Sequence, residues 1–343
     1  MSKPILVIKF GTASITLPSG EPDSRVISEI ARQVSGLHLH YRIILVSSGA
    51  VGAGKSQIRR YKGTMIQRKA AASVGNPLLV GLYATFFAPF KIHIAQSLCE
   101  RQHFAHRNKF LQLKQTFEEL WRSNIIPIVN ENDVISDREL KFSDNDELAT
   151  LLAVGFGAET LMYCTSVGGL LDADGSIVPQ VTDVNEVFKL VRTEKSFLGL
   201  GGMASKLTFA KLATRMGIRV VIFGMNQPDE LLRALKGEVG TVFIPGKSTL
   251  SARNRWLGSG GLVSGYLKVD DGAGKALLKR KSLLAVGVLE VMGSFEAGEL
   301  IEIYSSQQEM IAVARARATS QAIQENIKAN NFEVAHANDI VLL

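Results

Sequence analysis

The sequence predicts an open, mainly parallel α/β sheet sandwiched between helices, followed by a small mixed-β barrel domain. Short, apolar, β-branched runs alternate with segments of helical period between residues 4 and 257. Such alternation implies right-handed crossovers, which cover a parallel sheet with helices. The glycine-rich stretch 258–261 ends the alternation, and short β-type runs follow it. We therefore expect one domain over 1–257, a linker over 258–264 and a second domain over 265–343.

Each expected element follows from a local pattern. Buried strands are expected at 5–10, 42–46, 92–98, 125–130, 160–164 and 219–223, and helices at 25–37, 67–87, 109–121 and 203–216. Asp23 and Ser24 can cap the first helix, and Gly217 suits the left-handed position after the last. In the second domain, strands are expected at 283–291, 300–304, 310–314 and 339–343, with a helix near 320–330.

The composition is that of a soluble globular protein. The chain has 343 residues, of which 46% are apolar, and this length favours two domains. We see no apolar run of the roughly 18–20 residues that a membrane helix needs, and no signal-peptide pattern after Met1, so we expect a cytoplasmic protein.

The net charge of +7 is unevenly distributed along the chain. From Gly265 onward there are eight Lys/Arg and ten Asp/Glu residues, a balance of −2, so residues 1–264 carry +9. The positive field therefore belongs to the first domain and suits an anionic substrate there. It does not indicate a tail that binds nucleic acid.

The cysteines and the paired histidines do not indicate a metal or disulfide framework. Cys99 and Cys164 each lie inside an apolar run, as small core residues do. His103 and His106 form an isolated His-x-x-His, which lacks a third nearby ligand for zinc.

Residues 49–56 match the phosphate-binding pattern G-x-x-x-x-G-K-[ST], which would place Lys55 and Ser56 on a triphosphate and its magnesium ion. We reject this interpretation. No expected strand ends in the acidic residue that such a site also needs, and the motif follows the second strand rather than the first. The turn at 47–50 is still of interest, because it offers backbone N–H groups at a helix start.

Two lysines lie where a phosphate could bind. Lys9 is at the end of the first strand, beside Gly11 and Thr12, where the backbone can approach a ligand closely. Lys206 lies in the first turn of a helix that the glycine-rich loop 199–202 opens. Taken singly, Lys9 could simply reach solvent, and the loop could simply end a strand. Together they supply the positive charge and N–H donors that phosphoryl transfer requires.

A polar cluster lies between these lysines in the sequence. Asn130-Glu131-Asn132-Asp133 follows an apolar strand, and Ser143-Asp144-Asn145-Asp146 comes shortly afterwards at an expected helix start. Such side chains can bind a substrate ammonium group and orient lysines. The carboxylates at the helix start can equally be simple caps.

In order along the chain, these pieces resemble those of the amino-acid kinase superfamily and, within it, the glutamate 5-kinases. The resemblance rests on Lys9-x-Gly11-Thr12, on residues 47–50 and 130–133, on Asp144-Asn145-Asp146 and on Gly201-Gly202-Met203-x-x-Lys206. Residues 265–343 resemble the PUA domain that many glutamate 5-kinases carry. The supporting positions there are 269–273, 282–284, Gly293, Phe295 and Gly298.

The resemblance implies transfer of the γ-phosphoryl group of ATP, with Mg²⁺ on the phosphates, to the side-chain carboxylate of L-glutamate. The product would be glutamyl 5-phosphate, the entry to proline synthesis. Lys9, Lys206 and Asp146 would be catalytic, with Asp146 organising the lysines. Glutamate would be held by Ser48, Gly49, Asp133 and Asn145. The nucleotide would be held by Lys9, Thr165, Ser166, Leu200, Gly201, Gly202, Met203, Ala204, Ser205 and Lys206. The resemblance also implies a homo-oligomer, with proline as a candidate feedback inhibitor and no protein side chain on the metal.

The chain departs from the family pattern at several positions. Ser166 and Leu200 replace the usual Asp and Thr of the nucleotide site, and Asn76 stands where Gln is usual on the substrate side. Residues 315–318 replace the usual glycine and tyrosine of a PUA domain, and the domain is acidic, so we expect a structural or regulatory role for it rather than RNA binding. Two alternatives stay open: a sibling kinase that acts on another small acid, and a degenerate kinase fold that serves as an RNA-binding or regulatory module.

Overall fold

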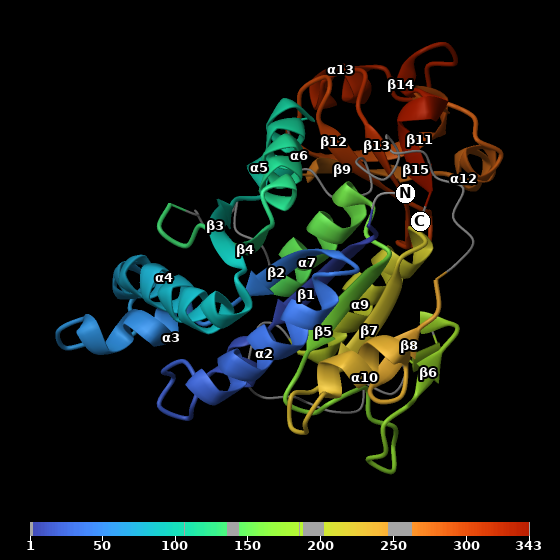
Figure 1. The fold of residues 1–343 in the computed structure, drawn as a ribbon. Coiled ribbons are helices and arrows are strands. Elements are labelled where there is room, and N and C mark those ends of the chain that lie inside the picture. The colour runs from blue at the N-terminus through green and yellow to red at the C-terminus, as the bar shows by residue number, and fades with distance from the viewer. Residues whose placement is uncertain are drawn as a thin grey trace. The chain divides into compact units, whose positions relative to one another are not determined.

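The computed structural model describes residues 3–105, 107–135, 144–184, 186–187, 202–245 and 263–342. The chain divides into two compact units (Figure 1). The first unit comprises Met1–Glu100 and Gln112–Ser248, and the second comprises Arg101–Leu111 and Thr249–Leu343. Most of the predicted linker, 258–264, lies outside the described residues, so the predicted domain boundaries stay a prediction.

An eight-stranded sheet forms the centre of the first unit, with strand order β3-β4-β2-β1-β5-β7-β8-β6. The strands are β1 (Ile5–Phe10), β2 (Arg42–Ser47), β3 (His93–Cys99), β4 (Ile125–Glu131), β5 (Thr160–Cys164), β6 (Gln180–Val181), β7 (Arg219–Phe223) and β8 (Thr241–Phe243). Neighbouring strands from β3 to β7 are parallel, and β8 runs antiparallel to β7. The prediction of a mainly parallel sheet is confirmed. Because β1, β2, β4 and β5 are parallel, the polar residues that follow them lie at the same end of the sheet, where the strands have their carboxyl ends.

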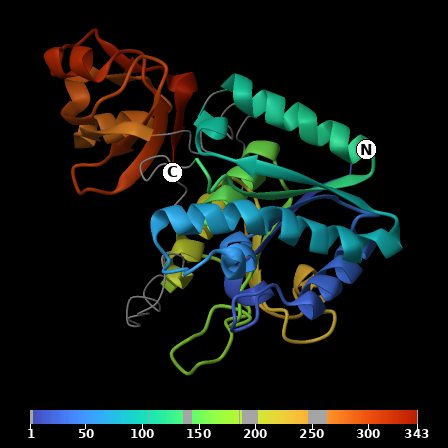
Figure 2. The same ribbon diagram turned by 90° about the vertical axis from the view of Figure 1, so that its left-hand side faces the viewer.

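Helices cover both faces of this sheet. They are α1 (Thr12–Ile15), α2 (Ser24–Leu37), α3 (Ala50–Gly54), α4 (Met65–Phe87), α6 (Arg107–Arg122) from Gln112 onward, α7 (Asn145–Phe156), α9 (Met203–Arg215) and α10 (Glu230–Lys236), with 3₁₀ turns η1 (Lys55–Gln57) and η2 (Ala88–Phe90). Helix α5 (Gln102–Ala105) belongs to the second unit. Strands β3 and β4 run between α4 and α6 (Figures 1 and 2). On the face opposite α2 and α4, α7 packs on β1 and β5, and α9 packs on β7 and on α7.

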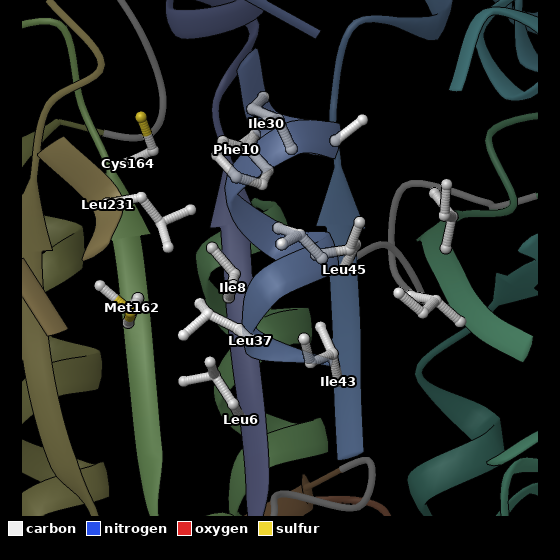
Figure 3. Close-up of a cluster of buried hydrophobic side chains, with 14 of the residues drawn as sticks. Leu6, Ile8, Phe10, Ile30, Leu37, Ile43, Leu45, Met162, Cys164 and Leu231 are labelled. Atoms are coloured by element: carbon white, nitrogen blue, oxygen red, sulfur yellow. The ribbon is translucent and has the colours of Figure 1, made fainter. Parts of the chain in front are cut away.

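The alternation of side chains along β1 assigns its residues to the two faces. Leu6, Ile8 and Phe10 join the apolar core beneath α2, α4 and α10 (Figure 3). Lys9 therefore lies on the opposite face, where α7 and α9 pack. Asp23 caps α2 by accepting a hydrogen bond from the Arg25 backbone N–H, and Gly217 follows α9 with a φ of +79°, so both helix boundaries confirm the predictions.

Helix α4 is longer and more apolar than the sequence analysis allowed. Residues Met65–Phe90 would be long and apolar enough to cross a membrane, and the expectation that no such run exists was wrong. Thr64 and Gln67 form a capping box at its start, and Leu79, Tyr83 and Phe87 are buried in the sheet core. Core helices of globular units pass the same length and composition test, so this single helix is weak evidence for a membrane.

The second unit contains a five-stranded mixed sheet of order β11-β9-β12-β13-β15 and a two-stranded sheet of β10 and β14. Its elements are β9 (Val263–Val269), α12 (Asp271–Leu278), β10 (Leu283–Leu284), η3 (Ala285–Gly287), β11 (Val288–Gly293), β12 (Leu300–Tyr304), β13 (Met310–Arg315), α13 (Ser320–Glu325), β14 (Glu333–Ala335), η4 (Ala337–Asp339) and β15 (Ile340–Leu342). The predicted run 283–291 is two strands separated by a 3₁₀ turn, and the predicted helix near 320–330 ends at Glu325. Strands β9 and β14 and helix α12 were not predicted.

Candidate active site

Two lysines and one aspartate meet near the carboxyl ends of the central strands of the first sheet. The Lys9 Nζ atom forms an ion pair with Asp146 Oδ1 at 2.6 Å, and Lys206 Nζ donates a hydrogen bond to Asp146 Oδ2 at 2.8 Å. The three residues come from β1, α7 and α9, and each is more than nine-tenths buried. The predicted convergence of Lys9, Asp146 and Lys206 is therefore present in the structure, with two ammonium groups on opposite oxygens of one carboxylate.

The first turn of α7 holds this carboxylate in place. Asp144 is the N-cap, and its Oδ1 accepts hydrogen bonds from the backbone N–H groups of Asp146 (2.9 Å) and Glu147 (3.1 Å). Its second oxygen accepts a hydrogen bond from Ser205 Oγ at 2.7 Å, which joins the starts of α7 and α9. The capping alternative thus applies to Asp144, whereas Asp146 faces the lysines.

The hydroxyl groups of Thr150 and Tyr163 form hydrogen bonds that hold the same turn of α7. Thr150 Oγ1 lies 2.6 Å from both the Asp146 carbonyl oxygen and the Tyr163 hydroxyl. Tyr163 is the register partner of Lys9 on the neighbouring strand. Burial, reinforced by the negative charge of Asp146, raises the pKa of Tyr163 well above its usual value, so the phenol stays protonated and can donate to Thr150.

Beside the lysines lies a chain of three side-chain amides and one hydroxyl. Asn145 Nδ2 donates to Ser48 Oγ at 2.8 Å and to Asn130 Oδ1 at 2.9 Å, and Asn130 Nδ2 donates to Asn76 Oδ1 at 3.1 Å. Among the residues that the structure describes, Asn145 Oδ1 and Asn76 Nδ2 are buried and have no hydrogen-bond partner. An unmet acceptor and an unmet donor in one hydrogen-bonded row suit a ligand that carries both an ammonium and a carboxylate group.

The remaining predicted substrate residues lie at neighbouring strand ends. Gly49 has a φ of +100° at the start of α3, a conformation that glycine adopts without strain. The Ser48 backbone N–H donates to the Phe10 carbonyl oxygen at 3.1 Å, which ties the end of β2 to the end of β1. Asp133 is half-buried two residues beyond β4.

The predicted nucleotide residues fall into two groups. Thr165 and Ser166 follow β5, where the Thr165 backbone N–H donates to Phe223 of β7 at 2.8 Å, and the Ser166 carbonyl oxygen accepts from Asn226 Nδ2 at 3.2 Å. Gly202 is the N-cap of α9, and the first turn of that helix is formed by Met203, Ala204, Ser205 and Lys206. Leu200 and Gly201 lie outside the described residues.

The glycines of the rejected phosphate-binding motif have a packing role instead. A Cβ at Gly54 would lie 2.0 Å from the Ala71 carbonyl oxygen of α4, and one at Gly52 would lie 2.2 Å from the Gly20 carbonyl oxygen. Lys55 begins the 3₁₀ turn after α3, whereas a phosphate-binding motif places its lysine at the start of a helix. Gly52 and Gly54 thus allow α3 to pack closely on the turn at Gly20 and on α4, respectively.

Sequence reasoning missed several residues of this site. Asn130 was recognised only as part of a polar cluster. Asn76 was recognised only as a position where the family usually has Gln. The Thr150 and Tyr163 pair has no sequence signal, because each residue lies inside an apolar run. For Asn76, the available signal was an amide inside the mainly apolar stretch 70–87 of α4.

Comparison with known proteins places the chain in a family. The model of the amino acid kinase family matches residues 4–224, and that of the PUA domain matches residues 265–336. The chain belongs to the amino acid kinase family.

The relatives of this amino acid kinase include curated glutamate 5-kinases. That of Proteus mirabilis (strain HI4320) is 37% identical over 335 residues, which cover 94% of this chain and 91% of the relative. That of Rippkaea orientalis (strain PCC 8801 / RF-1) is 40% identical over 317 residues, covering 88% and 85%.

A solved structure of carbamate kinase from Giardia lamblia bound to AMP-PNP has the same fold. It superposes with a TM-score of 0.54 at 16% identity and covers 71% of this chain and 99% of the other. At this identity the likeness concerns the fold alone. It agrees with the predicted amino-acid kinase fold of the first domain.

Proposed function

We propose that this protein transfers the γ-phosphoryl group of ATP to the side-chain carboxylate of L-glutamate, giving glutamyl 5-phosphate and ADP, as the first step of proline biosynthesis. The observation that carries this proposal is the contact of Lys9 and Lys206 with the two oxygens of Asp146, in a chain whose full-length relatives are glutamate 5-kinases. A pair of buried ammonium groups is suited to the charge that develops on a moving phosphoryl group.

The proposed reaction requires no proton transfer by the protein. A glutamate side chain is already ionised at pH 7, so its oxygen can attack the γ-phosphorus without a general base. The new bond joins that oxygen to phosphorus, and the bond from phosphorus to the β–γ bridging oxygen breaks, which leaves ADP. Asp146 is then needed to organise the lysines and not to remove a proton. Because both its oxygens contact lysines, we propose that Mg²⁺ is held by the ATP phosphates.

We propose that the substrates lie on either side of this cluster. Glutamate would be held by Ser48, Gly49, Asp133 and Asn145, since the unmet acceptor of Asn145 suits its ammonium group. The nucleotide would be held by Thr165 and Ser166, by Leu200 and Gly201, and by the start of α9 at Gly202, Met203, Ala204, Ser205 and Lys206. Backbone N–H groups at the start of α9 would face its phosphates.

The test is an ADP-release assay on the purified protein with and without L-glutamate, run with hydroxylamine. An acyl phosphate reacts with hydroxylamine to give a hydroxamate, so the proposal requires ADP and hydroxamate to form together and only when glutamate is present. A panel of other small acids is the control for a sibling kinase. Hydroxamate from one of these acids and not from glutamate would overturn the substrate assignment, and no turnover with any acid would favour a regulatory module.

Four finer points of the sequence analysis stay proposals. We propose a cytoplasmic, homo-oligomeric enzyme that proline inhibits, with a PUA-like domain that is structural or regulatory. Light scattering measures the oligomer, and inhibition by proline is measured in the same ADP assay. Tight, salt-sensitive binding of RNA by the full chain in a filter assay would contradict the role proposed for the second domain.

A further inference from the structure

The carboxylate of Glu230, the first residue of α10, has one engaged oxygen and one open oxygen. Its Oε2 accepts hydrogen bonds from the backbone N–H groups of Asn226 (2.6 Å) and Gln227 (2.9 Å), which fixes the loop between β7 and α10. The residue is only 9% exposed. Within the part of the chain that the structure describes, no group donates a hydrogen bond to its Oε1.

Glycines at two neighbouring positions leave room for this carboxylate. A Cβ at Gly224 would lie 2.7 Å from Glu230 Oε1, a distance that atoms do not adopt without a shift. Gly168, with a φ of +87°, faces the same oxygen, which would lie 3.9 Å from a Cβ at that position. The open oxygen therefore has glycine backbone on two sides, where a side chain would fill the space.

Glu230 also lies next to the proposed nucleotide residues. Asn226, whose backbone N–H bonds to Glu230, donates its side-chain N–H to the Ser166 carbonyl oxygen at 3.2 Å. Lys9, Lys206 and Glu230 all act electrostatically on the Cys164 thiol at the end of β5. The Glu230 carboxylate thus lies at the same end of the sheet as the two lysines, and its charge is opposite to theirs.

A carboxylate repels phosphates, so at this position it can only face the uncharged end of a nucleotide. Glu230 is 9% exposed and its Oε1 is not fully buried, so a donor on a bound nucleoside would replace solvent at this oxygen. We propose that Glu230 Oε1 accepts a hydrogen bond from the nucleoside of the phosphoryl donor and thereby selects the nucleotide. The donors available there are a ribose hydroxyl and the exocyclic amine of adenine. This inference rests on the proposed kinase function.

The variant Glu230→Gln tests this proposal and keeps the hydrogen bonds that hold the loop between β7 and α10. The amide oxygen of the new side chain can still accept from Asn226 and Gln227, which turns its NH₂ group toward the nucleoside and reverses the sense of the hydrogen bond. We expect the KM for ATP to rise about 10-fold or more, as loss of a hydrogen bond to a charged group does, with the KM for glutamate unchanged. Glu238→Gln, at an exposed position beyond the same helix, is the control and keeps wild-type values.

Two analogues identify the donor. 2′-Deoxy-ATP lacks a ribose hydroxyl, and ITP carries a carbonyl oxygen in place of the adenine amine. The wild type should bind the analogue without the relevant donor more weakly than ATP, and Glu230→Gln should abolish or reverse that preference. For each analogue, the affinity for ATP is divided by the affinity for that analogue. If these ratios are the same in the wild type and in Glu230→Gln, the proposal is overturned and Glu230 only holds the loop in place.

Calorimetric titration with AMP-PNP separates this proposal from the function itself. A wild type that consumes ATP with glutamate, while Glu230→Gln binds AMP-PNP as tightly as wild type does, refutes only the role of Glu230. A wild type with no glutamate-dependent turnover refutes the proposed function, whatever the variant binds.

Discussion

Two ammonium groups that share one carboxylate can lie side by side in a nearly dry site without large repulsion. Asp146 does this for Lys9 and Lys206, and its own backbone is held by Asp144 on one side and Thr150 on the other. In the proposed function, an arriving triphosphate would replace part of the contact between the lysines and Asp146 with contacts to phosphate oxygens. The arrangement thus prepares positive charge before the substrate binds, so little reorganisation is needed during the transfer.

Removing one of the two cations should lower turnover strongly. For Lys206→Ala we expect kcat to fall by about 10²–10³, the cost typical of losing one preorganised transition-state donor. Lys236→Ala, an exposed lysine of α10, is the control. The measurement is ADP release at saturating glutamate and ATP, with thermal unfolding of both variants to exclude misfolding. A kcat within threefold of wild type would contradict the proposed catalytic role.

The amide chain should govern affinity for the amino acid rather than turnover. Asn145→Ala removes the unmet acceptor Oδ1, so we expect the KM for glutamate to rise about 10- to 100-fold while the KM for ATP changes little. Asn108→Ala, exposed on α6, is the matched control. An equal rise of both KM values would show that Asn145 supports the site as a whole and does not contact glutamate.

At the scale of elements, the site depends on how closely helices pack. α3 and α4 contact each other through backbone, because Gly54 and Gly75 lie at their crossing. Ser48 and Gly49 directly precede α3, and Asn76 lies in α4. The position of the substrate-side residues is therefore set by a helix crossing that only glycine permits.

Two glycines of the same helix should respond in opposite ways to alanine. A Cβ at Gly75 would lie 1.7 Å from the Ala50 carbonyl oxygen, so we expect Gly75→Ala to lower the free energy of unfolding by about 1–3 kcal/mol or more. Among the described residues, none lies within 4 Å of a Cβ added at Gly81, and Gly81→Ala should stabilise the protein by up to about 1 kcal/mol. Urea unfolding measures both, and equal effects would contradict the packing role.

The sequence predicted the elements that have a strong local signal. β1, β2, β4, β5 and β7 are runs of apolar residues long enough to be recognised, and their observed ends differ from the predicted ones by one residue at most. β6 and β8 have two and three residues, too few to show a period, and β9 is interrupted by Ser264 and Gly265. These strands form because partner strands are already in place.

The same limit applies to the site. Lys9 and Lys206 were predictable because glycines and helix starts accompany them, and Asp146 because it lies in a run of polar residues. The roles of Asn76 and Glu230 could not be read in this way, because Asn76 meets Asn130 of β4, 54 residues later, and Asn226 meets Ser166, 60 residues earlier, only through the fold. The network that orients a site thus depends on tertiary contacts, which a single sequence does not reveal.

At the scale of the whole molecule, both cysteines are buried and free. Burial raises the pKa of each thiol from 9.0 to about 12. The unfolded chain therefore loses these protons at lower pH than the native protein does. Their contribution to stability is fully present below pH 9 and is lost as the pH rises toward 12.

We accordingly expect the free energy of unfolding to fall between pH 9 and 12, by at most about 1.4 kcal/mol per pH unit for each thiol. The double variant Cys99→Ala, Cys164→Ala should start from a lower stability, because of the cavities it creates, and show a shallower decline. Urea unfolding at several pH values measures both slopes. Parallel slopes in the two proteins would assign the alkaline loss to other groups.

The ion pairs of Asp146 draw on the first strand, a central helix and a late helix of the first unit. During synthesis, a ribosome makes Lys9 early and Lys206 only near the end of that unit. No partial chain that stops before α9 can hold both cations, so a truncated product should be catalytically silent however well its early strands pair. Activity in a cell would then show that translation has passed at least the end of α9.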